Sequence, residues 1–132
     1  MDILLRPQDF EAAKAALTSV GFVPNQVMNV TIILDGPEGR PSQGIRVIWA
    51  GKKVKEHYAS ATPLPANSTK MSGKRVVDLV ELVEMKLNSY RDKDRVHLRD
   101  MIGVGLIDAE WSVKFEPLLN QRLQALLDDP DG

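Results

Sequence analysis

The sequence predicts an α+β protein with α/β-like features: a small mixed β-sheet with a helix after the first strand, followed by a C-terminal helical bundle. Two observations predict this. Short β-like runs alternate with one amphipathic helical pattern up to residue 58, and every apolar pattern after residue 74 has helical spacing. A β-helix-β-β order is typical of a small α/β sheet. We expect 1–58 to form the α/β core, 59–73 a flexible connection and 74–132 a helical region packed on the core, in one structural domain overall.

The first predicted elements are a short strand and an amphipathic helix. Residues Asp2–Leu5 are mostly apolar and β-like, and Pro7 suits the first turn of a helix, where its missing N–H costs little. From residue 8 to 20 the apolar side chains recur every three or four positions, as on one helix face. They are Phe10, Ala13, Leu17 and Val20. Gly21 then supplies a C-terminal stop.

Three further runs predict strands. Residues 27–34 are rich in β-branched side chains and end at the turn signal Asp35-Gly36-Pro37. Residues 44–50 form a second β run. The sequence Gly51-Lys52-Lys53 is expected to turn this run toward a third, at 54–58.

The second half of the chain predicts helices. Residues 59–73 have no apolar period, so we interpret them as a mobile connection. An apolar stripe then runs from Val76 to Leu87, and a second helix is predicted from about Lys93 to Val104, with a cap near Asp92.

The C-terminal end of the chain predicts a short turn and a last helix. Asp108 can cap a turn through Trp111, and Pro117 interrupts further helix. A leucine-rich helix is expected to follow at 118–127, before a polar tail.

The composition excludes several classes of protein. The chain has 132 residues, 43% of them hydrophobic, and no cysteine, so it has neither disulfides nor a thiolate-bound zinc or iron–sulfur site. No apolar run approaches the roughly 18 residues of a membrane span, so we expect no membrane partner. The N-terminus has no basic leader with a long apolar core. Together these features predict a cytoplasmic protein.

The charges are unevenly distributed although the formal net charge is only −1. Residues 40–75 contain eight cations and one anion, Glu56, which gives this stretch a charge of +7. The cations are Arg40, Arg46, Lys52, Lys53, Lys55, Lys70, Lys74 and Arg75. Such a stretch is either a solvated hairpin and loop or a surface that attracts phosphates. It has few aromatic side chains for base stacking, so we expect nucleic acid to be an unlikely partner without excluding it.

Lys86 departs from the pattern of its own helix, because it lies at the edge of the apolar face. A lysine there must extend to solvent, pair with an anion or lose its charge. One interpretation is a structural ion pair with Asp94. The other is a cluster of Lys86, Arg91, Lys93 and Asp94 that receives a phosphate-bearing ligand. His97, three residues after Asp94, is more typical of a structural histidine than of a catalytic or metal-binding one.

Four segments resemble bacterial nucleotidyltransferase-fold proteins, including those of the abortive-infection toxin type. Residues 82–100 are similar to a stretch of that family in which a Lys-Leu pair is followed by a Lys-Asp pair; here these are Lys86-Leu87 and Lys93-Asp94. Residues 2–10 look like the family's strand that leaves the active site and enters a helix. The segments 46–54 and 104–108 resemble an uncharacterised bacterial branch of the same family. The resemblance covers nearly the whole chain.

The resemblance implies a nucleotidyltransferase-like fold and Mg²⁺-dependent transfer from a nucleoside triphosphate (NTP). Such enzymes hold two Mg²⁺ ions with carboxylates one residue apart on a strand and a third on a later strand. Asp2 matches the second carboxylate, as a metal ligand, and the first would precede Met1. The chain is therefore expected to be N-terminally truncated and to be impaired or inactive in this form. In a variant of this expectation the start codon is assigned too late, and the longer protein is an active enzyme.

The resemblance also covers Lys86, Lys93 and Asp94, which match the family's Lys-Leu and Lys-Asp positions. Together with Arg91 of the charged cluster, Lys86 and Lys93 are expected to bind the nucleotide phosphates, and Asp94 is expected to be catalytic. Mg²⁺ is the expected cofactor if the chain is active.

A non-catalytic interaction module is the alternative function, such as a toxin-neutralising or assembly partner. The basic stretch and the leucine-rich last helix would then present surfaces to a protein partner. The unpaired first strand would suit a second copy of the chain, because an exposed strand edge recruits partners.

Overall fold

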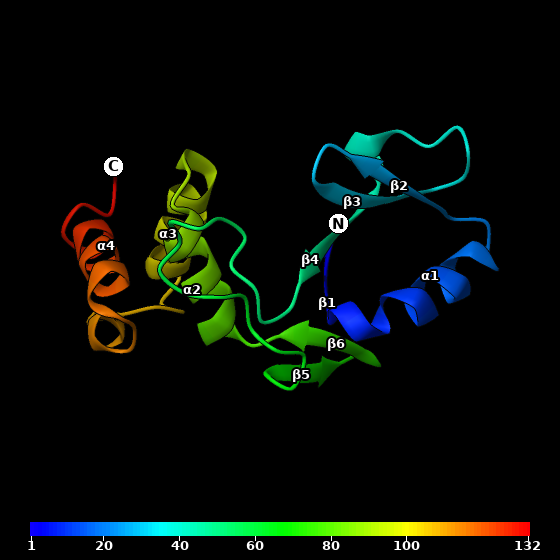
Figure 1. Cartoon of the computed structure of the whole chain (residues 1–132). Coiled ribbons are helices and arrows are strands. Elements are labelled where there is room, and N and C mark those ends of the chain that lie inside the picture. Colours follow the sequence, from blue (N-terminus) through cyan, green and yellow to red (C-terminus); the bar gives the residue numbers. More distant parts are fainter. The chain divides into compact units, whose positions relative to one another are not determined.

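The computed structural model describes residues 1–132 and contains four α-helices, one four-stranded sheet and one separate β-hairpin (Figure 1). The expected mixture of α and β structure with a small mixed sheet is confirmed. The chain divides into two compact units. We call 1–54 with 62–66 the sheet unit, and 55–61 with 67–132 the helical unit.

The sheet unit contains four strands in the order β1-β4-β3-β2. Strand β1 runs parallel to β4, with Asp2 opposite Arg46, and the other neighbours are antiparallel. The elements are β1 (Asp2–Leu5), α1 (Phe10–Thr18), β2 (Val23–Val27), β3 (Val30–Leu34) and β4 (Ile45–Trp49), with short 3-10 turns at Pro7–Asp9 and Pro41–Gln43.

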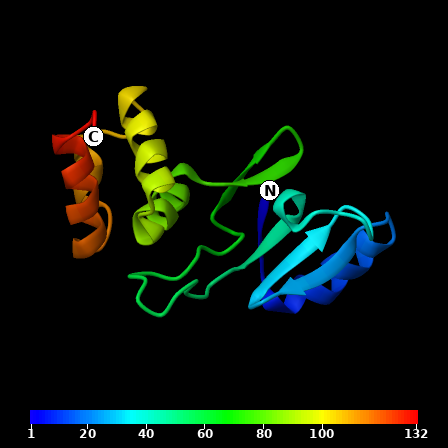
Figure 2. The same ribbon diagram turned by 90° about the horizontal axis from the view of Figure 1, so that it is seen from above.

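Helix α1 runs along one side of this sheet (Figures 1 and 2). Its Phe10 ring meets Trp49 of β4 edge-on, with 5.3 Å between the ring centroids. Ile33 and Val47, on the two central strands, are buried. Gly44 precedes β4 where a Cβ atom would lie 2.6 Å from Ile32 Cγ2, so the close approach of the two strands requires a glycine there.

The predicted strands differ from the observed ones in two places. The single strand predicted at 27–34 is the second half of a hairpin, which turns at Met28 and Asn29. The first half, β2, contains Pro24, which gave no strand signal and is tolerated because β2 lies at the sheet edge. The strand predicted at 54–58 is wrong: the backbone turns there, and Tyr58 N–H donates to the Lys55 carbonyl.

The helical unit consists of three main helices and a hairpin. Its elements are β5 (Ser68–Met71), β6 (Lys74–Val77), α2 (Leu79–Ser89), α3 (Asp92–Gly103), a 3-10 turn at Ala109–Val113 and α4 (Pro117–Asp128). One apolar core joins α2, α3 and α4, and each of its members is at most 2% exposed. They are Val83, Leu87, Leu98, Ile107, Leu119, Leu123 and Leu126.

Two expectations for this unit are corrected. The predicted connection at 59–73 contains β5, which pairs with β6 through a turn at Ser72 and Gly73, both with positive φ. The sequence did not predict this hairpin because its strands lack apolar alternation. The leucine-rich last helix turns three of its leucines inward, because Leu119, Leu123 and Leu126 are in the core, and Leu118 is 43% exposed. Pro117 is the first residue of α4, where its missing N–H is not needed.

The predicted helix ends agree more closely with the structure. Asp108 caps the turn at Ala109–Val113, and its carboxylate accepts a hydrogen bond from Glu110 N–H. No helix is both long and apolar enough to cross a membrane.

Candidate functional site

The α2–α3 corner gathers most of the charged residues singled out in the sequence. Tyr90 ends α2 in the left-handed conformation, with φ of 47°, and α3 begins two residues later. This reversal places Ser89 and Lys86 of the first helix beside Asp94 of the second. Lys86, Ser89, Arg91, Asp94 and His97 are called the corner cluster below.

Asp94 is the centre of the corner cluster and is 3% exposed. Its carboxylate accepts hydrogen bonds from Ser89 Oγ at 2.6 Å and Arg91 Nε at 2.7 Å. The backbone N–H of Arg91 also donates to it, at 3.3 Å, which satisfies a free donor at the start of α3. The ion pair predicted from the sequence is present, with Lys86 Nζ 3.8 Å from Asp94 Oδ1. The Asp94 carboxylate is thus surrounded by donors of its own chain.

These contacts set the charge of Asp94. Burial favours the protonated carboxyl, but the hydrogen bonds from Arg91 and Ser89 and the charge of Arg91 outweigh it and hold the pKa of Asp94 below its usual value. Asp94 is therefore ionised at neutral pH.

Lys86 bridges the two helices. Its side chain is 16% exposed, and Nζ lies 2.9 Å from His97 Nδ1. An ammonium group can only donate, so the imidazole nitrogen accepts this hydrogen bond. Lys86 therefore faces a carboxylate and an imidazole ring instead of extending into solvent.

Lys93 does not join the corner cluster. It is exposed on α3 and forms no ion pair with Asp94. Asp92, expected near the helix cap, forms an ion pair with Arg95 instead, and Arg91 takes the N-cap position. Of the predicted phosphate-binding residues, Lys86 and Arg91 are thus brought together, and Lys93 lies outside their contacts.

Asp2 belongs to the sheet unit, whereas the corner cluster belongs to the helical unit. The Arg46 guanidinium binds both Asp2 carboxylate oxygens, with Nη2 2.5 Å from Oδ2 and Nε 3.1 Å from Oδ1. Strand β4 has no acid, and nowhere do three His, Asp or Glu side chains come together as metal ligands. The surroundings of Asp2 therefore supply one of the three carboxylates that the resemblance implies, already paired with Arg46, and the Mg²⁺ site stays a prediction.

The corner has neighbours that the sequence did not reveal. Arg122 of α4 donates from Nη1 to the Leu87 and Asn88 carbonyls at the end of α2, at 2.6 and 3.0 Å. The buried Asn88 side chain bonds Ser60 in turn. These contacts join residues 28 to 35 positions apart, and no local pattern marks them.

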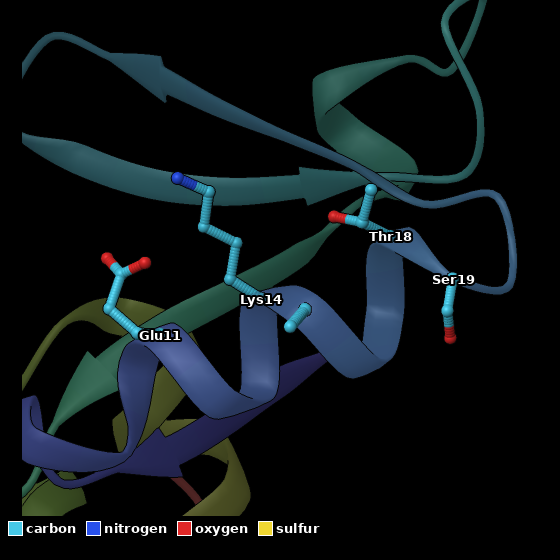
Figure 3. A pocket seen from close by; sticks show the side chains of 5 residues that line it. Glu11, Lys14, Thr18 and Ser19 are labelled. Atoms are coloured by element: carbon cyan, nitrogen blue, oxygen red, sulfur yellow. The ribbon is translucent and has the colours of Figure 1, made fainter.

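Two surface hollows lie outside the corner cluster. An open depression of about 400 Å³ follows α1 and is lined by Glu11, Lys14, Ala15, Thr18 and Ser19 (Figure 3). A second, of about 290 Å³, is lined by residues between Asp35 and Gln43. Neither contains a residue predicted to bind a nucleotide or a metal.

Comparisons with known proteins add no relative: no family model, no curated protein and no solved structure matches the chain.

Proposed function

We propose that the chain is a non-catalytic interaction module. The observation that carries this proposal is the pairing of both predicted active-site carboxylates with cations of the same chain. Asp94 is held by Arg91 and Lys86, and Asp2 is held by Arg46. A carboxylate that serves as a metal ligand or a general base needs accessible lone pairs.

The two pairs differ in their physical role. Asp94 is buried, and removing one of its partners leaves an uncompensated charge, so the corner cluster maintains the α2–α3 corner. The Asp2–Arg46 pair is roughly half exposed and contributes little to stability. Structural roles account for both pairs without a reaction.

A transfer assay tests this proposal. The chain is incubated with each radiolabelled NTP, Mg²⁺ and either RNA or protein acceptors, and labelled product is measured. We expect none. Product formation that Asp94→Asn abolishes and Asp92→Asn preserves would contradict the proposal, because the two variants remove one carboxylate charge from adjacent positions of α3.

A nucleotidyltransferase-like, NTP-binding domain is the second candidate. One observation supports it: the corner cluster contains two cations, Lys86 and Arg91, and one carboxylate, which leaves a positive charge beside the exposed Lys93. A triphosphate would have to compete with Asp94 for Lys86 and Arg91. Isothermal titration with NTP and Mg²⁺ distinguishes the two functions, because only this candidate predicts binding that Lys86→Ala removes.

A further inference from the structure

The β5–β6 hairpin carries a high density of positive charge. Residues 68–77, called the basic ribbon below, contain Lys70, Lys74 and Arg75 and no acid. All three cations are exposed, and none forms an ion pair. Asp78, directly after the ribbon, accepts a hydrogen bond from Thr69 Oγ1 at 2.6 Å. The positive charge of the ribbon is thus left for a partner.

The strand register brings like charges together. Lys70 lies directly opposite Arg75, so their side chains share one face of the ribbon, and Lys74 lies next to the turn on the other face. Like charges directly opposite each other destabilise a hairpin, and an isolated two-stranded hairpin is only marginally stable. An anion bound across the pair would remove this repulsion.

The ribbon is fixed at its base and free at its tip. Asn67 Nδ2 donates to Glu81 Oε1 of α2 at 3.0 Å, and the Asn67 carbonyl accepts a hydrogen bond from Asp78 N–H. The other end is a two-residue turn at Ser72 and Gly73, both exposed. Figure 2 shows the hairpin extending away from the start of α2.

We propose that the basic ribbon binds double-stranded DNA, with its three cations on the phosphates that border the major groove. This inference rests on the proposed function and names the partner class of the interaction module. A two-stranded ribbon fits the major groove of B-DNA, which is about 12 Å wide. The ribbon has no aromatic side chain for stacking single-stranded bases, and the major groove of an RNA duplex is too narrow for it.

Fluorescence anisotropy of a labelled 20-base-pair DNA duplex tests the proposal on the full chain between 50 and 200 mM salt. The test variant is Lys70→Gln/Arg75→Gln. The control, Lys14→Gln/Lys114→Gln, removes two exposed lysines outside the ribbon. Each phosphate contact contributes about 0.9 to the slope of log K against log salt. We therefore expect the test variant to lose affinity about tenfold or more at low salt and to lower the slope by about 1.8. The control should change affinity less than about twofold.

Lys74→Gln provides a second, single-site variant on the opposite face, with an expected loss of about threefold or more. Loss of the Lys70–Arg75 repulsion should leave the hairpin folded, and circular dichroism checks this. Equal losses of DNA affinity in the test and control variants would overturn the proposal, as would absent DNA binding.

Poly-L-glutamate and an RNA duplex of the same sequence serve as competitors. Ribbon-dependent binding to either one, as tight as to DNA, would assign the ribbon to an acidic protein or to RNA and overturn the DNA assignment.

The outcomes separate this inference from the proposed function. Nucleotidyl transfer would contradict the proposed function and leave the anisotropy result unaffected. If the chain did not bind DNA through the ribbon, the transfer assay would be unaffected, and the proposed non-catalytic function would still stand.

Discussion

Lys86 on α2 and His97 on α3 are joined through their side-chain nitrogens, with 2.9 Å between Nζ and Nδ1. The same ammonium group lies 3.8 Å from Asp94 Oδ1. One largely buried lysine thus joins two helices through a ring and a carboxylate, and its removal affects both contacts.

The first prediction concerns Lys86. Lys86→Ala should lower the free energy of unfolding of the helical unit by about 2 kcal/mol, because Asp94 loses part of its compensating charge. Urea unfolding followed by Trp111 fluorescence in a Trp49→Phe background reports on the helical unit alone. Lys93→Ala is the control and should change stability by less than about 0.5 kcal/mol. A stable Lys86→Ala protein that has lost an NTP-induced rise in Tm would support a phosphate site instead.

The second prediction concerns Asp94 itself. Asp94→Ala should destabilise the helical unit by about 3 kcal/mol, because Ser89 and Arg91 lose their acceptor and Lys86 its nearby anion. Thermal unfolding monitored by Trp111 fluorescence measures the loss. The matched control is Asp92→Ala, whose carboxylate is exposed and pairs only with Arg95. Equal effects of the two variants would show that the corner cluster does not hold the helices together.

The third prediction is the pH dependence that follows from Asp94. Its pKa is lowered on folding, so the unfolded chain binds more protons in acid and stability falls with falling pH. The contribution of Asp94 should be complete above about pH 5, since the unfolded carboxyl has a pKa near 3.9, and should decrease as the pH drops further. Urea midpoints between pH 2.5 and 6 measure it. The Asp94→Asn protein should show a shallower acid loss than the parent; an identical pH profile would assign the acid sensitivity to other carboxyls.

The fourth prediction concerns Asp2 and magnesium. Because Arg46 binds both carboxylate oxygens of Asp2, 5 mM Mg²⁺ should leave the Tm of the sheet unit unchanged within about 1 °C. Trp49 fluorescence in a Trp111→Phe background gives the readout. Asp2→Ala should cost no more than about 1 kcal/mol, since both side chains of the pair are exposed. A Mg²⁺-induced rise in Tm that Asp2→Ala removes would establish the metal site.

The fifth prediction tests the packing of α4. Leu123 is fully buried, so Leu123→Ala should destabilise the helical unit by about 3 kcal/mol through the cavity it leaves. Leu118, five positions earlier, is 43% exposed, and Leu118→Ala should cost less than about 1 kcal/mol. Chemical denaturation measures the free energy of unfolding of both variants. Similar losses of stability would mean that Leu123 is not packed in the core.

The sequence predicted elements whose signal is local. The helix over α1 and the helices α2 to α4 follow from apolar spacing, and the cap at Asp108 follows from a residue type with a strong positional preference. The Lys86–Asp94 ion pair could also be predicted, because it follows from two helices adjacent in sequence and from the position of Lys86 on the helical wheel.

The elements that the sequence missed depend on distant partners. Strand β2 contains Pro24 and Asn25 and becomes a strand through its pairing with β3. The β5–β6 hairpin is mostly polar and has no core-facing alternation. The contact of Arg122 with the end of α2 spans 35 residues. Such tertiary contacts leave no periodic trace in a single sequence.

The division of the chain has a consequence for how it can be cut. Between residues 54 and 67 the backbone passes from the sheet unit to the helical unit, returns for 62–66 and leaves again. A single cleavage at residue 66 would therefore leave the sheet unit complete in the fragment 1–66 but would remove 55–61 from the helical unit. The fragment 67–132 would lack Ser60, the hydrogen-bond partner of the buried Asn88, and the fragment 1–66 would keep that serine without its partner. The two units are thus interleaved along the chain, and no single break in the gene separates them with both complete.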